Sequence, residues 1–361
     1  MLHMERNNCI SGNSLAGTIL RLLQQRLPRK WTVLQTESPS TMKPRPDFFL
    51  DLTGPHGERA RIGVMAKASV EPKDVTFLAE QLRGSRKAWG DEIVPLIAAP
   101  FLSLSTRQRL LELDIPYADT TGNIRIFTSR PAIFIETQGA ERNPNRTERP
   151  ARSLKGAKAG RIVRALCDLR PPFGVRALAE ETGINPGYVS RVLTFLETEA
   201  LVRREPRGPI TEVAWRKLIE RWARDYSFIA SNRVISYLEP RDIAGAASRL
   251  AAAAKRAAIT GSAAAACVAP VAPTRLLAAY VESPEEVAKD LGLRPAESGA
   301  NVLLAEPYDK VVFDRTDERD GTPYVALSQA AVDLLSGPGR NPSEAHALLD
   351  WMQANESAWR R

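Results

Sequence analysis

The segment VRALAEETGINPGYVSRVLTFLETEA, residues 175–200, decides how the chain is organised. A short helix is predicted from Val175, and a turn follows in which Gly183 supplies a positive φ. Asn185 is a favoured helix cap and Pro186 suits the first helical position, so a second helix is predicted from there to about Ala200. The segment therefore predicts two helices joined by a tight turn.

The flanking residues predict a third helix and a hairpin. Apolar residues recur at helical spacing over residues 157–169, and Pro171 and Pro172 end this helix. Residues 202–213 contain two short runs suited to strands, joined by a basic tip rich in turn-forming residues. The chain from residue 158 to 226 is therefore predicted to form one compact module.

Three positions of this module have the spacing of a helix–turn–helix crossing: small Ala179, then Gly183, then apolar Val189. With the cap and the hairpin, the module resembles the winged helix-turn-helix regulators of the MarR and IclR kind. On the second helix of the pair, Val189, Val192, Leu193 and Leu196 are predicted to face inward. The resemblance implies that the other side of this helix enters the DNA major groove. The implied DNA contacts are Asn185, Gly187, Tyr188, Ser190, Arg191 and Thr194 on that helix and Arg203, Arg204 and Arg207 in the hairpin.

A basic run precedes the module. Residues 142–164 contain eight basic residues and one acid, a net charge of +7 where the whole chain carries +8. A run placed beside a recognition module is suited to neutralise phosphates, so contact with DNA is predicted for Arg152, Lys155 and Lys158. The eight basic residues are Arg142, Arg146, Arg149, Arg152, Lys155, Lys158, Arg161 and Arg164, and residues 141–157 are interpreted as a basic linker.

Composition narrows the class of protein. With 361 residues, 43% of them hydrophobic and 25% charged, the chain has the material for several folded domains. The three cysteines and three histidines are scattered, so no disulfide framework, metal site or cofactor is predicted. We expect a cytoplasmic protein with no membrane partner, because a signal pattern and a long apolar run are both missing from the sequence.

The first 140 residues predict an α/β domain with the order α-β-β-β-α-β. This order, with Asp47 leading one strand and Lys67 closing the next, resembles the PD-(D/E)XK restriction-endonuclease-like fold. The resemblance implies Asp47 and Lys67 as the catalytic residues if the domain cleaves DNA. The predicted helices cover residues 15–27, 74–89 and 105–113, and the predicted strands cover 31–35, 47–52, 61–67 and 93–98, then lie near 117, 124–127 and 133–136.

The second acid of that motif is missing. Met65 occupies its position, two residues before Lys67, and a thioether is a poor ligand for the hard cation that this chemistry needs. Glu71 and Glu80 are the nearby carboxylates that could replace it. We therefore expect a nuclease-like domain kept for binding or assembly, without cleavage.

Residues 227–361 predict a further α/β domain. A helix is expected over residues 244–258 and strands over 275–281, 301–306 and 311–313. Gly261-Ser262 at a strand-to-helix turn resembles the start of a nucleotidyltransferase phosphate site. The next strand ends in one acid, Glu282, where the enzymes carry a pair, so a degenerate transferase domain is expected.

A wider resemblance covers roughly the last two hundred residues. The module, the Thr260-Gly261-Ser262 turn, ANVLLAEPYD (residues 300–309) and VALSQAAVDLL (residues 325–335) resemble the AbiEi-type antitoxins and regulators. That family implies promoter binding through the winged helix and, in toxin–antitoxin operons, action against a nucleotidyltransferase toxin. The nuclease-like first domain departs from the minimal antitoxin plan.

The sequence thus predicts a multidomain α+β and α/β protein that is not an enzyme and regulates transcription by binding specific double-stranded DNA. Two alternatives stay open: a nuclease that the winged helix targets to DNA, and an antitoxin that acts on a toxin protein. A second copy of the chain is a further candidate partner.

Overall fold

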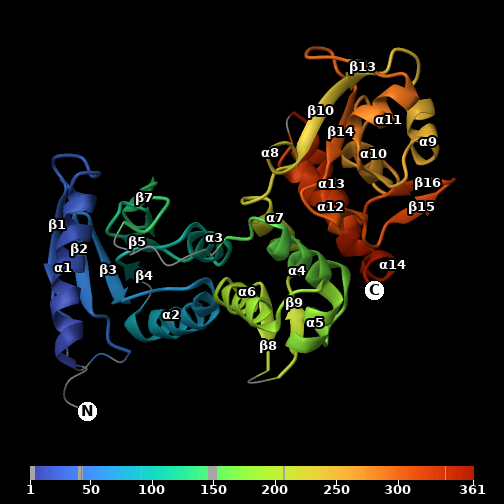
Figure 1. The fold of residues 1–361 in the computed structure, drawn as a ribbon. Helices are drawn as coiled ribbons and strands as arrows, with labels where there is room; N and C mark the ends of the chain where they lie inside the picture. Colours follow the sequence, from blue (N-terminus) through green and yellow to red (C-terminus); the bar gives the residue numbers. More distant parts are fainter. Residues whose placement is uncertain are drawn as a thin grey trace. The chain divides into compact units, whose positions relative to one another are not determined.

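The computed structural model describes residues 5–39, 42, 44–90, 92–144, 153–205, 208–337 and 339–361 (Figure 1). The chain forms two compact units, Met1–Arg149 and Pro150–Arg361. Both units combine helices with strands, so the structure is mixed α and β, as the sequence predicts. Among the described residues, no helix is both long and apolar enough to cross a membrane.

The described strands of the first unit form one seven-stranded sheet in which they lie in chain order. They are β1 (Thr32–Thr36), β2 (Phe48–Thr53), β3 (Arg59–Ala66), β4 (Ile93–Ala99), β5 (Tyr117–Asp119), β6 (Ile124–Ser129) and β7 (Ala132–Thr137). β3 pairs in parallel with β4, and β4 with β5, whereas the other pairs are antiparallel. Each strand predicted for this region is confirmed.

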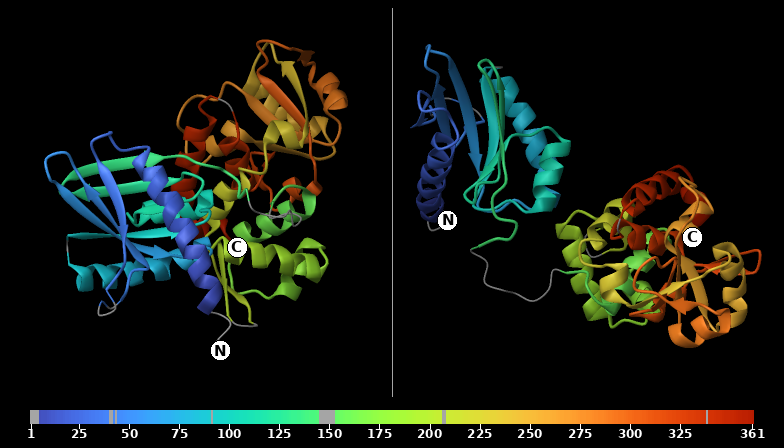
Figure 2. Two further views of the ribbon diagram at one scale, coloured as in Figure 1. Left: turned by 90° about the vertical axis from the view of Figure 1, so that its left-hand side faces the viewer. Right: turned by 90° about the horizontal axis from the view of Figure 1, so that it is seen from above.

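Helices cover both faces of this sheet (Figure 2). On one face, Ile19 and Leu23 of the first helix pack with Leu50 and Ile62 of the sheet. On the other face, Leu78 and its neighbours pack with the sheet in a separate core. The helical elements are α1 (Glu5–Gln24), the 3-10 turn η1 (Pro72–Asp74), α2 (Val75–Trp89) and α3 (Leu104–Glu112).

The second unit begins with the module that the sequence predicts. Its elements are α4 (Ala157–Asp168), α5 (Val175–Thr182), α6 (Pro186–Thr198), β8 (Val202–Arg204), β9 (Ile210–Val213), α7 (Trp215–Trp222) and α8 (Phe228–Ser231). β8 and β9 pair as an antiparallel hairpin. The three predicted helices and the predicted hairpin are therefore confirmed as elements.

The described strands of the remaining residues form a second seven-stranded sheet. In spatial order they are β13 (Arg294–Pro295), β10 (Arg233–Leu238), β14 (Val302–Glu306), β12 (Leu277–Val281), β11 (Ala257–Thr260), β16 (Thr322–Tyr324) and β15 (Asp317–Arg319). The helical elements are α9 (Ile243–Ala253), α10 (Gly261–Ala266), α11 (Pro284–Leu291), the 3-10 turn η2 (Lys310–Phe313), α12 (Leu327–Leu335), α13 (Asn341–Ala354) and α14 (Glu356–Trp359).

Two expectations for this region are wrong. The helix expected over residues 244–258 ends at Ala253, and residues 257–260 form β11. All four β11 residues are buried, and their backbone pairs with β12 and β16, so tertiary pairing overrides the helix preference of alanine. The strand expected over residues 311–313 is the 3-10 turn η2, which the Asp309 side chain caps by accepting from the Val311 amide at 2.9 Å.

One hydrophobic core runs through the second unit. Leu166 and Leu193 of the module belong to the same buried cluster as Tyr280 of the sheet and Leu348 of α13. The boundary expected between residues 226 and 227 therefore lies inside a compact unit, and it stays a prediction. The module and the region after residue 226 therefore share one cluster of buried hydrophobic residues.

The last residues of the chain are tied to the end of α4. The buried Arg360 guanidinium donates to the carbonyls of Cys167 at 3.0 Å and Leu166 at 3.2 Å. The Arg361 amide donates to the Asp168 carbonyl at 2.9 Å. A cation at this position satisfies carbonyls that a helix end leaves without partners and suits the negative end of the helix dipole.

Candidate nucleic-acid interface

The turn between α5 and α6 has the geometry that its sequence predicts. Gly183 adopts φ +66° and ends α5, which confirms the left-handed turn. The Asn185 side chain accepts from the Gly187 amide at 2.8 Å, and Pro186 is the first residue of α6. The cap and the glycine together fix the direction in which α6 leaves α5.

The two faces of α6 separate as predicted. Val189, Val192, Leu193 and Leu196 are buried, which confirms the inward face, and Phe195 joins them in the core. Phe195 was not among the residues predicted to face inward, although its aromatic side chain was the signal for it. The inward side chains hold the helix rigidly and leave the opposite side toward solvent.

The opposite side of α6 presents a short polar row. Gly187, Arg191 and Thr194 are exposed, and Tyr188 and Ser190 are half-buried. The Arg191 guanidinium lies over the Tyr188 ring, 5.5 Å from its centroid. A cation held against an aromatic face has fewer orientations to lose on binding, so Arg191 is preorganised to form hydrogen bonds outward.

The hairpin arginines have protein partners. Arg203, whose side chain is 74% exposed, pairs with Glu212 across the hairpin. Arg204 pairs with Glu197 of α6, and this contact holds the pKa of Arg204 above its usual range. The second pair is less exposed and links the hairpin to α6. Arg207 lies outside the described residues.

The basic run divides into two groups. Leu154 is fully buried and its amide donates to Asp225 at 2.7 Å, which anchors the chain just before α4. Lys155 and Lys158 are exposed beside this anchor. Arg152 lies outside the described residues, as do Arg146 and Arg149.

The other group, Arg161 and Arg164, which are not among the predicted DNA contacts, is bonded within the protein. Arg161 forms an ion pair with Asp309 at 2.9 Å. Arg164 is fully buried and donates to Asp168 of its own helix at 3.2 Å. A fully buried guanidinium cannot contact a phosphate, so counting charges overstated the basic surface. The i, i+4 spacing of Arg164 and Asp168 was the available signal for their pairing.

Asp168 is the centre of a buried polar cluster where the module meets the rest of the unit. It accepts from Arg164, from Arg315 at 2.8 Å and from the Ser328 hydroxyl. Arg315 also donates to Glu181 of α5 at 2.9 Å. The cluster therefore connects both α4 and α5 to the part of the unit after residue 300.

Asp333 forms a second buried cluster. It accepts from Thr260 at 2.5 Å, from Tyr226 at 2.9 Å and from Gln329 at 2.9 Å. Tyr280 donates to it as well, at 2.9 Å. Burial raises the pKa of Asp333 to about 6, although these four donors oppose the shift. The carboxylate joins Tyr226, which follows α7, to β11, β12 and α12.

Ser262, in the turn predicted to resemble a phosphate site, is engaged within the protein. Its hydroxyl donates to Glu344 of α13. Gly261 has φ +63° and is buried, so the strand-to-helix turn exists as expected. An acidic partner at 7% exposure opposes binding of a phosphate at this turn.

In the first unit, the structure brings Asp47 and Lys67 to the same end of β3. The Asp47 carboxylate accepts from the Ala66 amide at 2.7 Å, and the Lys67 amide donates to the Ala98 carbonyl at 2.8 Å. Met65 is 9% exposed and packs in the core beside α2. Glu71 pairs with Lys73 at 2.9 Å. The described residues contain no group of three or more His, Cys, Asp and Glu residues that could hold a metal ion.

Comparison with known proteins finds a family model that matches part of the chain. Residues 213–353 match a family model described as transcriptional regulator, AbiEi antitoxin, type IV TA system. No curated protein and no solved structure matches the chain. The match supports the AbiEi-type resemblance over about two fifths of the chain, from the end of the hairpin into α13, and the α5–α6 pair lies outside it.

Proposed function

We propose that α4, α5, α6 and the β8–β9 hairpin form a winged helix that binds double-stranded DNA, and that the protein is a sequence-specific transcriptional regulator. The observation that carries the proposal is the polar row of α6. There the Arg191 guanidinium lies over the Tyr188 ring, on the side of the helix that faces away from the core. The DNA major groove admits one helix and displays the bases as distinct patterns of donors and acceptors. The family match after the hairpin supports the same function.

The contacts divide between bases and phosphates. Tyr188, Ser190, Arg191 and Thr194 face the base edges, with Asn185 and Gly187 at the start of the helix. Lys155, Lys158 and Arg152 neutralise phosphates beside the module, as does Arg203, whose exposed partner Glu212 is easily exchanged. Arg204 must leave the less exposed Glu197 to contact a phosphate. Arg207, which lies outside the described residues, is a further proposed phosphate contact.

Replacing Arg191 with Ala tests the proposal. Binding sites are first selected from random duplexes, and affinities for the best site and for unselected DNA are measured by fluorescence anisotropy. We expect Arg191→Ala to lose about 1 to 3 kcal/mol on the selected site, because a bidentate base contact is worth that much, and to change little on unselected DNA. Arg233→Ala is the matched control, since this arginine lies on β10 and pairs with Glu285. Unchanged binding of both DNAs by Arg191→Ala would refute the assignment of α6 to the groove.

The family match favours a second function, which we propose beside the first: the protein is the antitoxin of a toxin–antitoxin pair. A toxin encoded next to this gene would then arrest growth alone and not when co-expressed with this protein. Arg191→Ala separates the two functions, because it should abolish repression of the promoter and keep the protection. A neighbouring gene product that is harmless alone would argue against the antitoxin function.

A further inference from the structure

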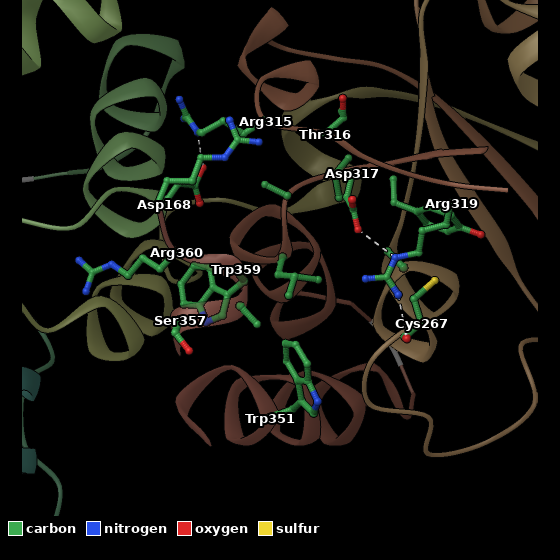
Figure 3. Close-up of a pocket in the computed structure, with 17 residues that line it drawn as sticks. Asp168, Cys267, Arg315, Thr316, Asp317, Arg319, Trp351, Ser357, Trp359 and Arg360 are labelled. Atoms are coloured by element: carbon green, nitrogen blue, oxygen red, sulfur yellow. Dashed lines mark hydrogen bonds and ion pairs between the residues drawn. The ribbon is translucent and has the colours of Figure 1, made fainter. Parts of the chain in front are cut away.

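The second unit contains a pocket of about 370 Å³ that no function assigned above uses (Figure 3). It is lined by Asp168 at the end of α4, Ala264 of α10, Cys267 after α10, Arg319, and residues 315–317, 324–327 and 357–361. Trp351 of α13 completes the wall. Its volume lies within the range of small-molecule sites, about 300 to 1,000 Å³.

The charge of the lining favours an anion. Four arginines and two aspartates line the pocket. Asp168 is 4% exposed and already accepts from three side chains, so it offers little to a ligand. Asp317 is different, because its side chain is 62% exposed and pairs with Arg319 at 2.9 Å. An incoming anion can therefore displace Asp317 into solvent and take its place at Arg319.

Arg319 is positioned for that exchange. Its Nη1 donates to the Cys267 carbonyl at 2.9 Å, which holds the guanidinium at the wall whichever anion its Nε binds. Figure 3 shows Arg319 between Asp317 and Cys267, with Trp359 on the other side of the view. A charge-assisted hydrogen bond from a guanidinium held in place is strong and directional.

The opposite wall favours an aromatic group. The Trp359 indole donates to the Met352 carbonyl at 2.9 Å and packs edge-on against Trp215, with ring centroids 4.9 Å apart. These contacts immobilise the ring, and Trp351 lines the pocket beside it. Rigid aromatic walls recognise planar ligands at little entropic cost.

We propose that this pocket binds a small aromatic anion, a planar ring that carries a carboxylate or a phosphate, with Arg319 as the anion contact and Trp359 and Trp351 as the ring contacts. The pocket also touches Arg315, which joins Asp168 of α4 to Glu181 of α5. Glu181 is 44% exposed and is the more easily displaced of these two partners. A bound anion that competes for Arg315 loosens α5, so the ligand weakens DNA binding; this step rests on the proposed function.

Calorimetric titration of the full chain tests the pocket without DNA. The probes are AMP with adenosine and ribose 5-phosphate, and 4-hydroxybenzoate with 4-hydroxybenzamide. We expect at least one aromatic anion to bind with a Kd below about 1 mM. The compounds that lack its negative charge or its aromatic ring should bind about tenfold more weakly. The AMP and hydroxybenzoate arms distinguish a nucleotide from an aromatic acid. Failure of both anions, or equal binding of the neutral compounds, would overturn the proposal.

Two variants should change the affinity for the probe in opposite directions, which a merely structural role of these residues would not produce. Arg319→Gln should weaken the bound probe about tenfold, because it removes a charged donor. Asp317→Asn should tighten the probe about threefold, because it removes the competing carboxylate. Arg233→Gln, another arginine paired with exposed carboxylates, is the control and should change nothing. Weaker probe binding in both pocket variants, or an equally weakened affinity in the control, would count against the site.

DNA affinity measured with saturating probe tests the coupling separately. We expect the probe to weaken DNA binding about threefold and DNA to weaken probe binding by the same factor, as linkage requires. A probe that binds without this effect refutes the coupling and supports the pocket. Absence of DNA binding in every condition refutes the proposed function instead, and the calorimetric result on the pocket stands.

Discussion

Nη1 of Arg164 donates to Oε1 of Gln329 at 3.1 Å, so a fully buried cation in α4 is bonded directly to α12. The same guanidinium donates to the carbonyls of Val311 at 3.2 Å and Asp314 at 2.9 Å. Removing it would take one donor from each of the Asp168 carboxylate, the Gln329 side chain and these two carbonyls. Arg164 thus stabilises the junction between the module and the rest of its unit.

We expect Arg164→Met to lower the free energy of unfolding by about 3 kcal/mol, because it breaks a buried ion pair with Asp168 and removes the guanidinium donor from buried carbonyls. Urea denaturation followed by circular dichroism measures the change. Lys158→Met in the same helix is the control, and as an exposed substitution it should stay within about 0.5 kcal/mol of the unchanged protein. Equal effects of the two substitutions would show that Arg164 has no such role.

The buried Asp333 carboxyl predicts that the stability of the protein falls as the pH rises. Its pKa is about 6 in the folded protein and ordinarily 3.8, so between these values the folded state holds a proton that the unfolded state has released. The contribution of Asp333 to stability is therefore highest below its ordinary pKa and is lost as the pH rises through 6, by about 3 kcal/mol in total. Asp333→Asn cannot titrate. We expect the difference in unfolding free energy, unchanged protein minus variant, to fall by about 2 kcal/mol of this total between pH 4 and pH 6. A difference that is constant over this interval would contradict the burial of an ionisable group here.

The basic residues from Arg152 to Lys158, at the start of α4 and just before it in the sequence, predict a salt dependence of DNA binding. Changing Arg152, Lys155 and Lys158 together to Gln should flatten the slope of log affinity against log salt by about 2 to 3 units, since each neutralised phosphate contributes about −0.9. The preferred sequence should not change, because phosphate contacts carry little sequence information. Arg241, Lys255 and Lys289, exposed cations of the sheet region, changed together to Gln remove the same charge and are the control. If both triple variants flatten the slope alike, the effect is one of net charge and the segment is a spacer.

Met65 predicts an inactive nuclease-like domain. Supercoiled plasmid should stay intact with the purified protein in Mg²⁺ or Mn²⁺, because a buried thioether stands where the second metal-binding acid is expected. Met65→Glu restores that acid beside Asp47 and Lys67, and metal-dependent nicking by this variant, lost again in Asp47→Ala, would show that the fold assignment is right. Cleavage by the unchanged protein that Asp47→Ala abolishes would instead establish the nuclease function.

The sequence alone determined the features that depend on neighbouring residues. A left-handed turn favours glycine, and Gly183 adopts this conformation. Asn185 followed by Pro186 favours a helix start, because the cap and the fixed φ act within one turn. The inward face of α6 and the strands of the first sheet followed for the same reason, since periodic apolar residues select both the element and its buried side. The proposed DNA contacts are the residues that this face leaves outside.

Tertiary structure decided what depends on residues far apart in the chain. Residues 257–260 are alanine-rich enough for a helix, and only pairing with β12 and β16 makes them a strand. The basic residues before and within α4 form one run in the sequence, yet Arg161 pairs with Asp309, 148 residues later, and the buried Arg164 donates to Gln329, 165 residues later. Charge in a sequence is a count, whereas exposure is set by packing, so the sequence could not separate the arginines that hold the fold together from the lysines left facing solvent.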